Sequence, residues 1–98
     1  MVETHVYLRF KPESQTPKFR SAFAERCKAL ETILEVRGIR VGAPADDRSE
    51  AAWDLCIILE FDSIDSATAC AAHSDFQALL DRDRNPQLAV TKDWKFIM

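Results

Sequence analysis

Glycine is scarce in this chain, and its scarcity excludes two kinds of catalytic motif. Only Gly38 and Gly42 occur among the 98 residues. A phosphate-binding loop needs several glycines close together, and the nucleophile elbow of many hydrolases needs the pattern Gly-x-Ser-x-Gly. Neither pattern is present. We therefore expect neither a glycine-rich phosphate site nor a hydrolase elbow.

Residues that bind metals are also few, and their spacing is unfavourable. The three cysteines lack Cys-x-x-Cys spacing, and the two histidines, His5 and His73, lack the i, i+4 spacing of helical metal sites. An odd number of cysteines without such spacing is typical of a protein whose thiols stay reduced. We therefore predict a cytoplasmic protein with no metal site and no cofactor, haem and flavin included.

Long apolar stretches and basic runs are missing as well. The longest wholly apolar run, LCIIL at 55–59, is far shorter than the roughly 20 residues of a membrane-spanning helix. The N-terminal segment carries Glu3 and no long apolar stretch, so it does not resemble a signal peptide. The net charge is −3, with no basic face for a nucleic-acid backbone. We expect neither a membrane nor a nucleic acid as partner.

The length fits one domain over residues 1–98. Hydrophobic residues make up 47% and charged residues 30%, which is ordinary for a globular domain. A chain of this size buries roughly 60–65% of the surface that its unfolded form exposes. A sheet buried on both faces would therefore need a partner.

Hydrophobic spacing predicts the order of strands and helices. Apolar residues alternate in the strands and recur at steps of three and four in the first helix. Thr16 and Pro17 suit the start of that helix, and Ser74 with Gln77 has the spacing of a capping box. The expected elements are a strand over 3–11, a helix over 17–34, a strand over 38–43, a polar loop over 44–51, a strand over 52–61, helical segments over 62–72 and 74–82, and a strand over about 88–97.

The order β-α-β-β-α-β predicts an α+β, ferredoxin-like protomer. Helices would cover one face of a four-stranded antiparallel sheet. We expect that covered face to carry Val6, Leu8, Phe10, Ile39, Val41, the alternating row from Trp53 to Phe61, Trp94 and Phe96.

The opposite face mixes charges with large apolar groups. It would carry His5, Tyr7, Arg9, Arg40, Cys56, Ile58, Glu60, Asp93, Lys95 and Ile97. A second copy of the sheet would bury this mixture, and the predicted homodimer interface consists of Tyr7, Arg9, Arg40, Cys56, Ile58, Glu60 and Lys95. A solvated face with scattered apolar residues stays open as the alternative.

Two segments resemble the stress-responsive A/B barrel domain family, Dabb. They are THVYLRFKPE at 4–13 and WDLCIILEFDSIDSATACAAHSDF at 53–76, and the resemblance extends over nearly the whole chain. The resemblance implies a ferredoxin-like protomer, two copies of which form a homodimeric α/β barrel. The family is functionally mixed: many members have no assigned activity and are linked to stress responses, and one plant member is a polyketide cyclase.

The resemblance also implies where the cyclase residues would fall. That cyclase uses a histidine of the first strand, a tyrosine on the second helix and the second histidine of His-Pro-x-His. Alignment places Phe76 on that second histidine, His73 on the first, and Cys70 on the tyrosine. Thr4 takes the place of the strand histidine when the strand is aligned by its end, and His5 then points to the opposite face. A cyclase that uses the same base and tyrosine is not expected.

Candidate catalytic residues are His73, His5 and Tyr7. A histidine with an ordinary pKa suits general base catalysis, but His73 also fits a helix junction where it would cap or pack. His5, Tyr7 and Arg9 can form a polar cluster inside a barrel, either as an anion site or as part of the interface. The three cysteines are expected to be buried, inert thiols.

The small residues of 67–72 either pack closely on the sheet or leave room for a ligand. The expected pocket residues are Phe19, Phe23, Trp53, Ile57, Cys70, Phe76 and Trp94. Two functions stay open: a Dabb protein without catalysis that binds a small apolar or aromatic ligand, and a cyclase-like or isomerase-type enzyme with a histidine base. An imidazole in a pocket wall would favour the enzyme. Aromatic filling of the protomer and a His73 bonded only to backbone would oppose it.

Overall fold

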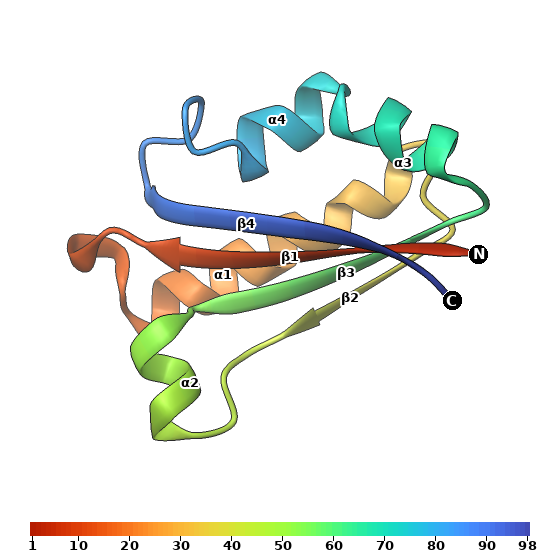
Figure 1. Ribbon diagram of the computed structural model, residues 1–98. Helices are drawn as coiled ribbons and strands as arrows, with labels where there is room; N and C mark the ends of the chain where they lie inside the picture. The colour runs from red at the N-terminus through yellow and green to blue at the C-terminus, as the bar shows by residue number, and fades with distance from the viewer.

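The computed structural model describes residues 1–98 and has the predicted ferredoxin-like order, with one helix more than expected. The sheet is four-stranded and antiparallel, in the order β2-β3-β1-β4. Helices α1, α3 and α4 lie on one side of it (Figure 1). The elements are β1 (Val2–Phe10), the 3-10 turn η1 (Pro12–Ser14), α1 (Pro17–Lys28), the 3-10 turn η2 (Ala29–Thr32), β2 (Gly38–Gly42), α2 (Asp47–Ala52), β3 (Leu55–Phe61), α3 (Ile64–Ala71), α4 (Ser74–Leu80) and β4 (Leu88–Ile97).

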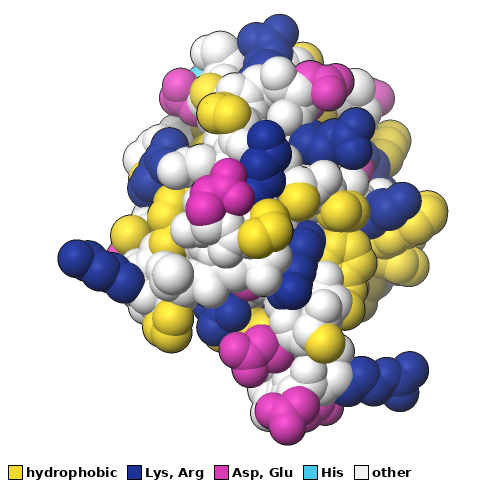
Figure 2. All heavy atoms as spheres, turned by 90° about the vertical axis from the view of Figure 1, so that its left-hand side faces the viewer, with side chains coloured by type: hydrophobic (Ala, Val, Ile, Leu, Met, Phe, Trp, Pro, Cys, Tyr) yellow, Lys and Arg dark blue, Asp and Glu magenta, His cyan; other side chains and the backbone are white.

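Polar side chains start the helices and explain the additional one. The Thr16 hydroxyl accepts a hydrogen bond from Phe19 N at 3.1 Å, as expected for the start of α1. Asp46 does the same for Ser49 N at 2.8 Å, and this cap starts α2 inside the predicted polar loop. Hydrogen bonds from Ser49 hold the pKa of Asp46 below its ordinary value. Helix α2 projects beyond the end of the sheet, carries charges of both signs and buries no residue (Figures 1 and 2).

The face of the sheet under the helices is the core, as predicted. Leu8, Phe10 and Ile57 have no exposed surface, and every second residue of β1 and β3 is buried there. Phe19 and Phe23 of α1 pack on Phe10, with ring centroids 4.9 and 5.0 Å away. Large aromatic rings therefore fill the space between α1 and the sheet.

The predicted orientation of the last strand is wrong. The register pairs His5 with Trp94 and Glu3 with Phe96, so both aromatic residues lie on the face that the helices leave uncovered. Paired residues of antiparallel strands share a face, and Lys95, which pairs with Thr4, consequently lies on the helix side. Asp93 and Ile97 lie on the helix side as well, not on the opposite face.

The physical reason for this error is an irregularity in the pairing of β1 with β4. The register shifts between Arg9 and Phe10, where Phe10 pairs with Leu88 but Arg9 pairs with Val90. Leu88 is buried in the core, and the shift sets the faces of all later residues of β4. Alternation of apolar residues cannot reveal such a shift in an edge strand that is exposed along most of its length.

The start of β3 also differs from the prediction. The strand begins at Leu55 instead of residue 52, and the buried side chain just before it is Asp54, not Trp53. Asp54 accepts hydrogen bonds from Phe10 N at 2.8 Å and from Arg20 at 3.2 Å. Because the carboxylate takes the inward position, Trp53 lies half-buried against Tyr7, with ring centroids 5.6 Å apart.

Candidate functional sites

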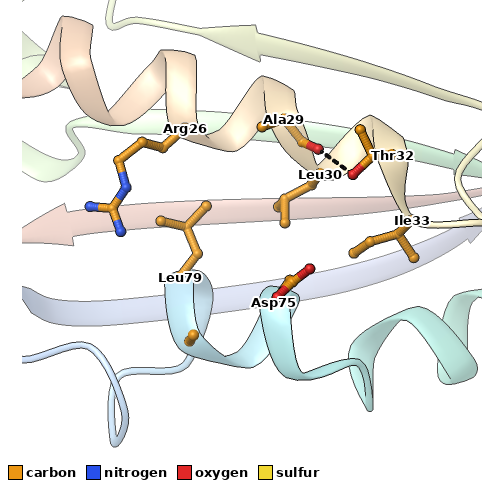
Figure 3. A pocket seen from close by; sticks show the side chains of 8 residues that line it. Arg26, Ala29, Leu30, Thr32, Ile33, Asp75 and Leu79 are labelled. Carbon is orange, nitrogen blue, oxygen red and sulfur yellow. Dashed lines mark hydrogen bonds between the residues drawn. The ribbon is translucent and has the colours of Figure 1, made fainter.

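One hollow in the helix layer is a groove between α1, with the following η2, and α4. We call it the helix groove. Its volume is about 390 Å³, and Leu30, Ile33 and Leu79 form most of its apolar wall. Figure 3 shows side chains of the two helices facing each other across it. The groove exists because α1 and α4 lie side by side on the sheet without closing over the buried leucines.

Two opposite charges border the helix groove. The guanidinium of Arg26 lies 5.5 Å from the centroid of the Phe23 ring, a cation–π contact. The carboxylates near α1 are engaged elsewhere, Glu25 with Lys28 at 3.0 Å and Glu50 with Arg20 at 3.8 Å. Arg26 therefore has no carboxylate partner. Asp75 lines the other wall, where its only nearby positively chargeable group is the His73 imidazole at 3.9 Å.

A second hollow, of about 240 Å³, lies between α4 and the sheet. Phe76, Val6 and Leu80 are its apolar wall, and Thr91 and Asp93 of β4 contribute polar atoms together with Gln77 and Asp81. Thr91 donates to Leu80 O at 3.2 Å, and Asp93 accepts from Lys95 at 3.1 Å. The polar atoms are thus partly satisfied within the chain. No imidazole lines this hollow or the helix groove.

His73 caps a helix. Its backbone is extended, and its Nδ1 accepts a hydrogen bond from Asp75 N at 3.1 Å at the start of α4. The cap is therefore His73, one residue before the predicted Ser74. The imidazole is about two-fifths exposed and has no hydrogen-bond partner besides that backbone N–H. The structure places His73 away from His5 and Tyr7, which lie on the uncovered side of the sheet.

The uncovered side of the sheet, called the outer face below, carries a polar cluster beside large apolar groups. His5 Nε2 lies 3.0 Å from Glu3 Oε1, and the His5 ring makes an edge contact with Phe96 at 5.2 Å. Arg40 reaches Glu3 at 3.4 Å and Glu60 at 4.0 Å. The register assigns to the outer face Glu3, His5, Tyr7, Arg9, Gly38, Arg40, Gly42, Cys56, Ile58, Glu60, Val90, Lys92, Trp94 and Phe96.

The predicted interface residues do not all share this face. Tyr7, Arg40, Cys56, Ile58 and Glu60 lie on it. Lys95 lies on the helix side, as described above. Arg9 belongs to the outer face by register, but its guanidinium bonds within the protomer, to Glu50 O at 2.7 Å and to Gln15 at 3.2 Å.

The seven predicted pocket residues do not line one pocket. Phe19, Phe23, Ile57 and Cys70 belong to or pack against the filled core. Phe76 lines the hollow under α4, and Trp53 lines a third hollow of about 230 Å³ with Tyr7 on the outer face. Trp94 is 59% exposed, and none of the hollows described includes it.

Sequence reasoning missed Arg26 and Asp75. Each looked like an ordinary charge on a helix surface, because the groove exists only once α1 and α4 are packed side by side. The apolar stripe that the sequence predicts over 17–34, which includes Leu30 of η2, was the one available signal for this wall.

The three thiols are free. Burial raises the pKa of Cys27 to about 12, partly opposed by Arg26, and burial raises that of Cys70 to about 11 with a further increase from Glu35. Burial also raises the pKa of Cys56, and the charge of Arg40 opposes it. A high pKa leaves little thiolate for nucleophilic attack. No group of three or more potential metal ligands is present, and no helix is long and apolar enough to span a membrane.

Comparisons with known proteins identify the fold. No family model matches the sequence, and no curated protein matches it. Three solved structures are similar over nearly the whole chain. A dimeric ferredoxin-like protein of unknown function from Thermobifida fusca has TM-score 0.77 and 20% identity, over 99% of this chain and 90% of that one. A dabb family protein with a ferredoxin-like fold from Mesorhizobium loti has TM-score 0.74 and 16% identity, over 99% and 95%. A hydroxynitrile lyase from Passiflora edulis has TM-score 0.77 and 14% identity, over 99% and 92%.

These likenesses confirm the predicted fold: the chain has the ferredoxin-like architecture found in a dabb family protein. The same architecture occurs in a lyase and in a protein of unknown function. The fold alone therefore does not determine the activity.

Proposed function

We propose that this protein is a homodimer in which two outer faces pack against each other to form an α/β barrel. The observation that carries the proposal is the contrast between the two faces of the sheet. On the helix side, alternate residues of β1 and β3 are buried, whereas no helix covers the outer face. There, Trp94 is 59% and Phe96 49% exposed. Complete burial of an exposed ring contributes about 1.5–3 kcal/mol, so burying the part of each ring that is still exposed contributes roughly half as much. The similar protein from Thermobifida fusca is dimeric.

The charges of the outer face are compatible with this burial. Glu3 is already 8% exposed in the single chain, and His5 and Arg40 are both within 3.4 Å of its carboxylate. Charges that are paired before association lose less solvation when a second surface covers them. Arg40, whose side chain is 63% exposed, retains donors for a partner subunit.

We further propose that the dimer binds a small apolar molecule in the helix groove and does not use a histidine base. The groove has an apolar wall and a volume suited to a small ligand. The alternative, a cyclase-like or isomerase-type enzyme, receives no support from the geometry. The aromatic rings of α1 fill the protomer, His73 bonds backbone, and His5 bonds Glu3 on the other side of the sheet. We also propose a cytoplasmic location, which the free thiols support. The Dabb resemblance supports a link to stress responses.

Light scattering after size exclusion tests the dimer. The native protein should have twice the mass of the chain at micromolar concentration, and Trp94→Asp should be monomeric because it places a carboxylate in the apolar part of the interface. Leu34→Asp is the matched control, since Leu34 is 83% exposed but lies outside the outer face. A native monomer would overturn the proposal.

Amide NMR shifts test the groove. Addition of 1-octanol should move the resonances of Leu30, Ile33 and Leu79 and leave those of the outer face unchanged. Shifts confined to another part of the molecule, or no saturable shift at all, would reject the helix groove as the ligand site.

A further inference from the structure

The helix groove differs from an ordinary apolar crevice in the chemistry of its walls. Its hydrophobic residues are aliphatic: Leu30, Ile33 and Leu79, with the small Ala29 and Ala78 between them. No aromatic ring lines it. A flat aromatic ligand would find no ring to stack on, whereas a flexible alkyl chain gains from any apolar surface that it removes from water.

One end of the groove offers a cation without a partner. Arg26 has no carboxylate within the chain, and its guanidinium lies over the Phe23 ring beside the groove. Figure 3 shows this guanidinium at the same end as Leu79. The planar donor fork of arginine matches a carboxylate in a bidentate arrangement, which a lysine ammonium does not. The apolar wall and this cation together suit an amphipathic acid.

Asp75 further restricts which amphipathic acids the groove can bind. It precedes Leu79 by one turn of α4, about 6 Å along the helix axis, so it lies farther along the groove than the Arg26 end (Figure 3). Its carboxylate accepts no hydrogen bond from a side chain of α1, and its side chain is 73% exposed. A second anionic group on the ligand would be repelled there, whereas a hydroxyl would find an acceptor.

We infer that the helix groove takes a medium-chain aliphatic monocarboxylate with a hydroxyl at its far end. The carboxylate binds Arg26, the alkyl chain covers Leu30 and Leu79, and the hydroxyl donates to Asp75. This inference rests on the proposed binding of a small apolar molecule and names its chemical class.

Isothermal titration calorimetry with three probes of equal chain length tests the class. The probes are 8-hydroxyoctanoate, octanoate and 1-octanol, each with the native dimer. We expect 1-octanol to bind at least tenfold more weakly than octanoate because it cannot engage the guanidinium. Octanoate should in turn bind several-fold more weakly than 8-hydroxyoctanoate, because its methyl end displaces water near the Asp75 carboxylate without donating a hydrogen bond in its place.

Two pairs of variants locate the contacts. Arg26→Gln should reduce octanoate to the affinity of 1-octanol, whereas Lys28→Gln, which removes the same charge from the same helix outside the groove, should not. Asp75→Ala should abolish the preference for the hydroxy acid. Asp65→Ala is its control, since Asp65 holds the same second position in α3 that Asp75 holds in α4.

The outcomes separate the two proposals. Equal binding of all three probes, unchanged by Arg26→Gln, would overturn the inferred class and leave the apolar groove in place. Saturable binding of none of the probes would overturn both. The tenfold preference for octanoate, lost only in the Arg26 variant, would support the inference.

Discussion

Replacement of Asp54 by alanine should destabilise the protein more than any surface charge can. The Asp54 side chain is 1% exposed, and its carboxylate holds Phe10 N at 2.8 Å, Arg20 at 3.2 Å and Arg9 at 3.7 Å. Removal leaves a buried N–H without an acceptor, which costs about 1–3 kcal/mol. It also removes one partner of the largely buried guanidinium groups of Arg9 and Arg20, which keep their contacts to Gln15 and Glu50. Breaking a buried ion pair costs about 3–5 kcal/mol.

Arg20 and Arg9 keep 19% and 23% of their side-chain surface exposed to water. We therefore take the lower part of the range of about 3–5 kcal/mol as the total cost of Asp54→Ala. The expected loss is about 3–4 kcal/mol of unfolding free energy, or a fall in Tm of at least about 12 °C for a domain of this size. Urea titration followed by circular dichroism measures it. Asp54→Asn, which keeps an acceptor for Phe10 N, should lose about half as much.

Asp62→Ala is the matched control. Its carboxylate lies 2.9 Å from Arg37, closer than Asp54 lies to Arg20, but both partners are more than half exposed. An exposed pair contributes about 0–1 kcal/mol. If Asp54→Ala costs less than about 1 kcal/mol, or no more than Asp62→Ala, the reasoning from burial is refuted.

Two further changes test the interior. Thr4→Val should raise the unfolding free energy by about 1 kcal/mol, because the Thr4 hydroxyl is buried without a hydrogen-bond partner. The control Thr91→Val removes a hydrogen bond to Leu80 O and should lower the unfolding free energy. A loss of stability in the Thr4 variant would contradict the first expectation. At pH 8, a thiol reagent should modify at most Cys56 in the native protein, because burial raises the pKa of Cys27 to about 12 and of Cys70 to about 11. Rapid labelling of all three thiols without unfolding would show that these sulfurs are not buried.

Most of the fold follows from local patterns in the sequence. The covered faces of β1 and β3 were predictable because each strand has a continuous alternating row, from Val6 to Phe10 and from Leu55 to Phe61. The start of α1 was predictable from Thr16 and Pro17. These signals lie within a few residues of the structure that they specify, so tertiary context had little opportunity to override them.

The errors arose where long-range contacts decide the outcome. Trp94 and Phe96 look like core residues in isolation, but the register shift beside Phe10 turns them to the outer face. Trp53 lost its inward place to Asp54, since only the tertiary structure supplies the Arg20 and Phe10 N donors that make a buried carboxylate tolerable. Likewise, Arg26 and Asp75 become partners of one groove only after two helices are packed.

The correction of β4 changes the physical argument for the dimer. With Trp94 and Phe96 on the helix side, the apolar part of the outer face would have consisted of Tyr7, Cys56, Ile58 and Ile97, which a solvated surface can tolerate singly. The observed register adds two exposed aromatic rings beside His5 and Glu3 and removes Ile97 together with the charged Asp93 and Lys95 from the same face. The outer face is therefore more apolar than the sequence predicted. The position that most needs a second subunit is Trp94 in the edge strand, and this is why Trp94→Asp is a sharper test than any substitution of the central Tyr7 or Ile58.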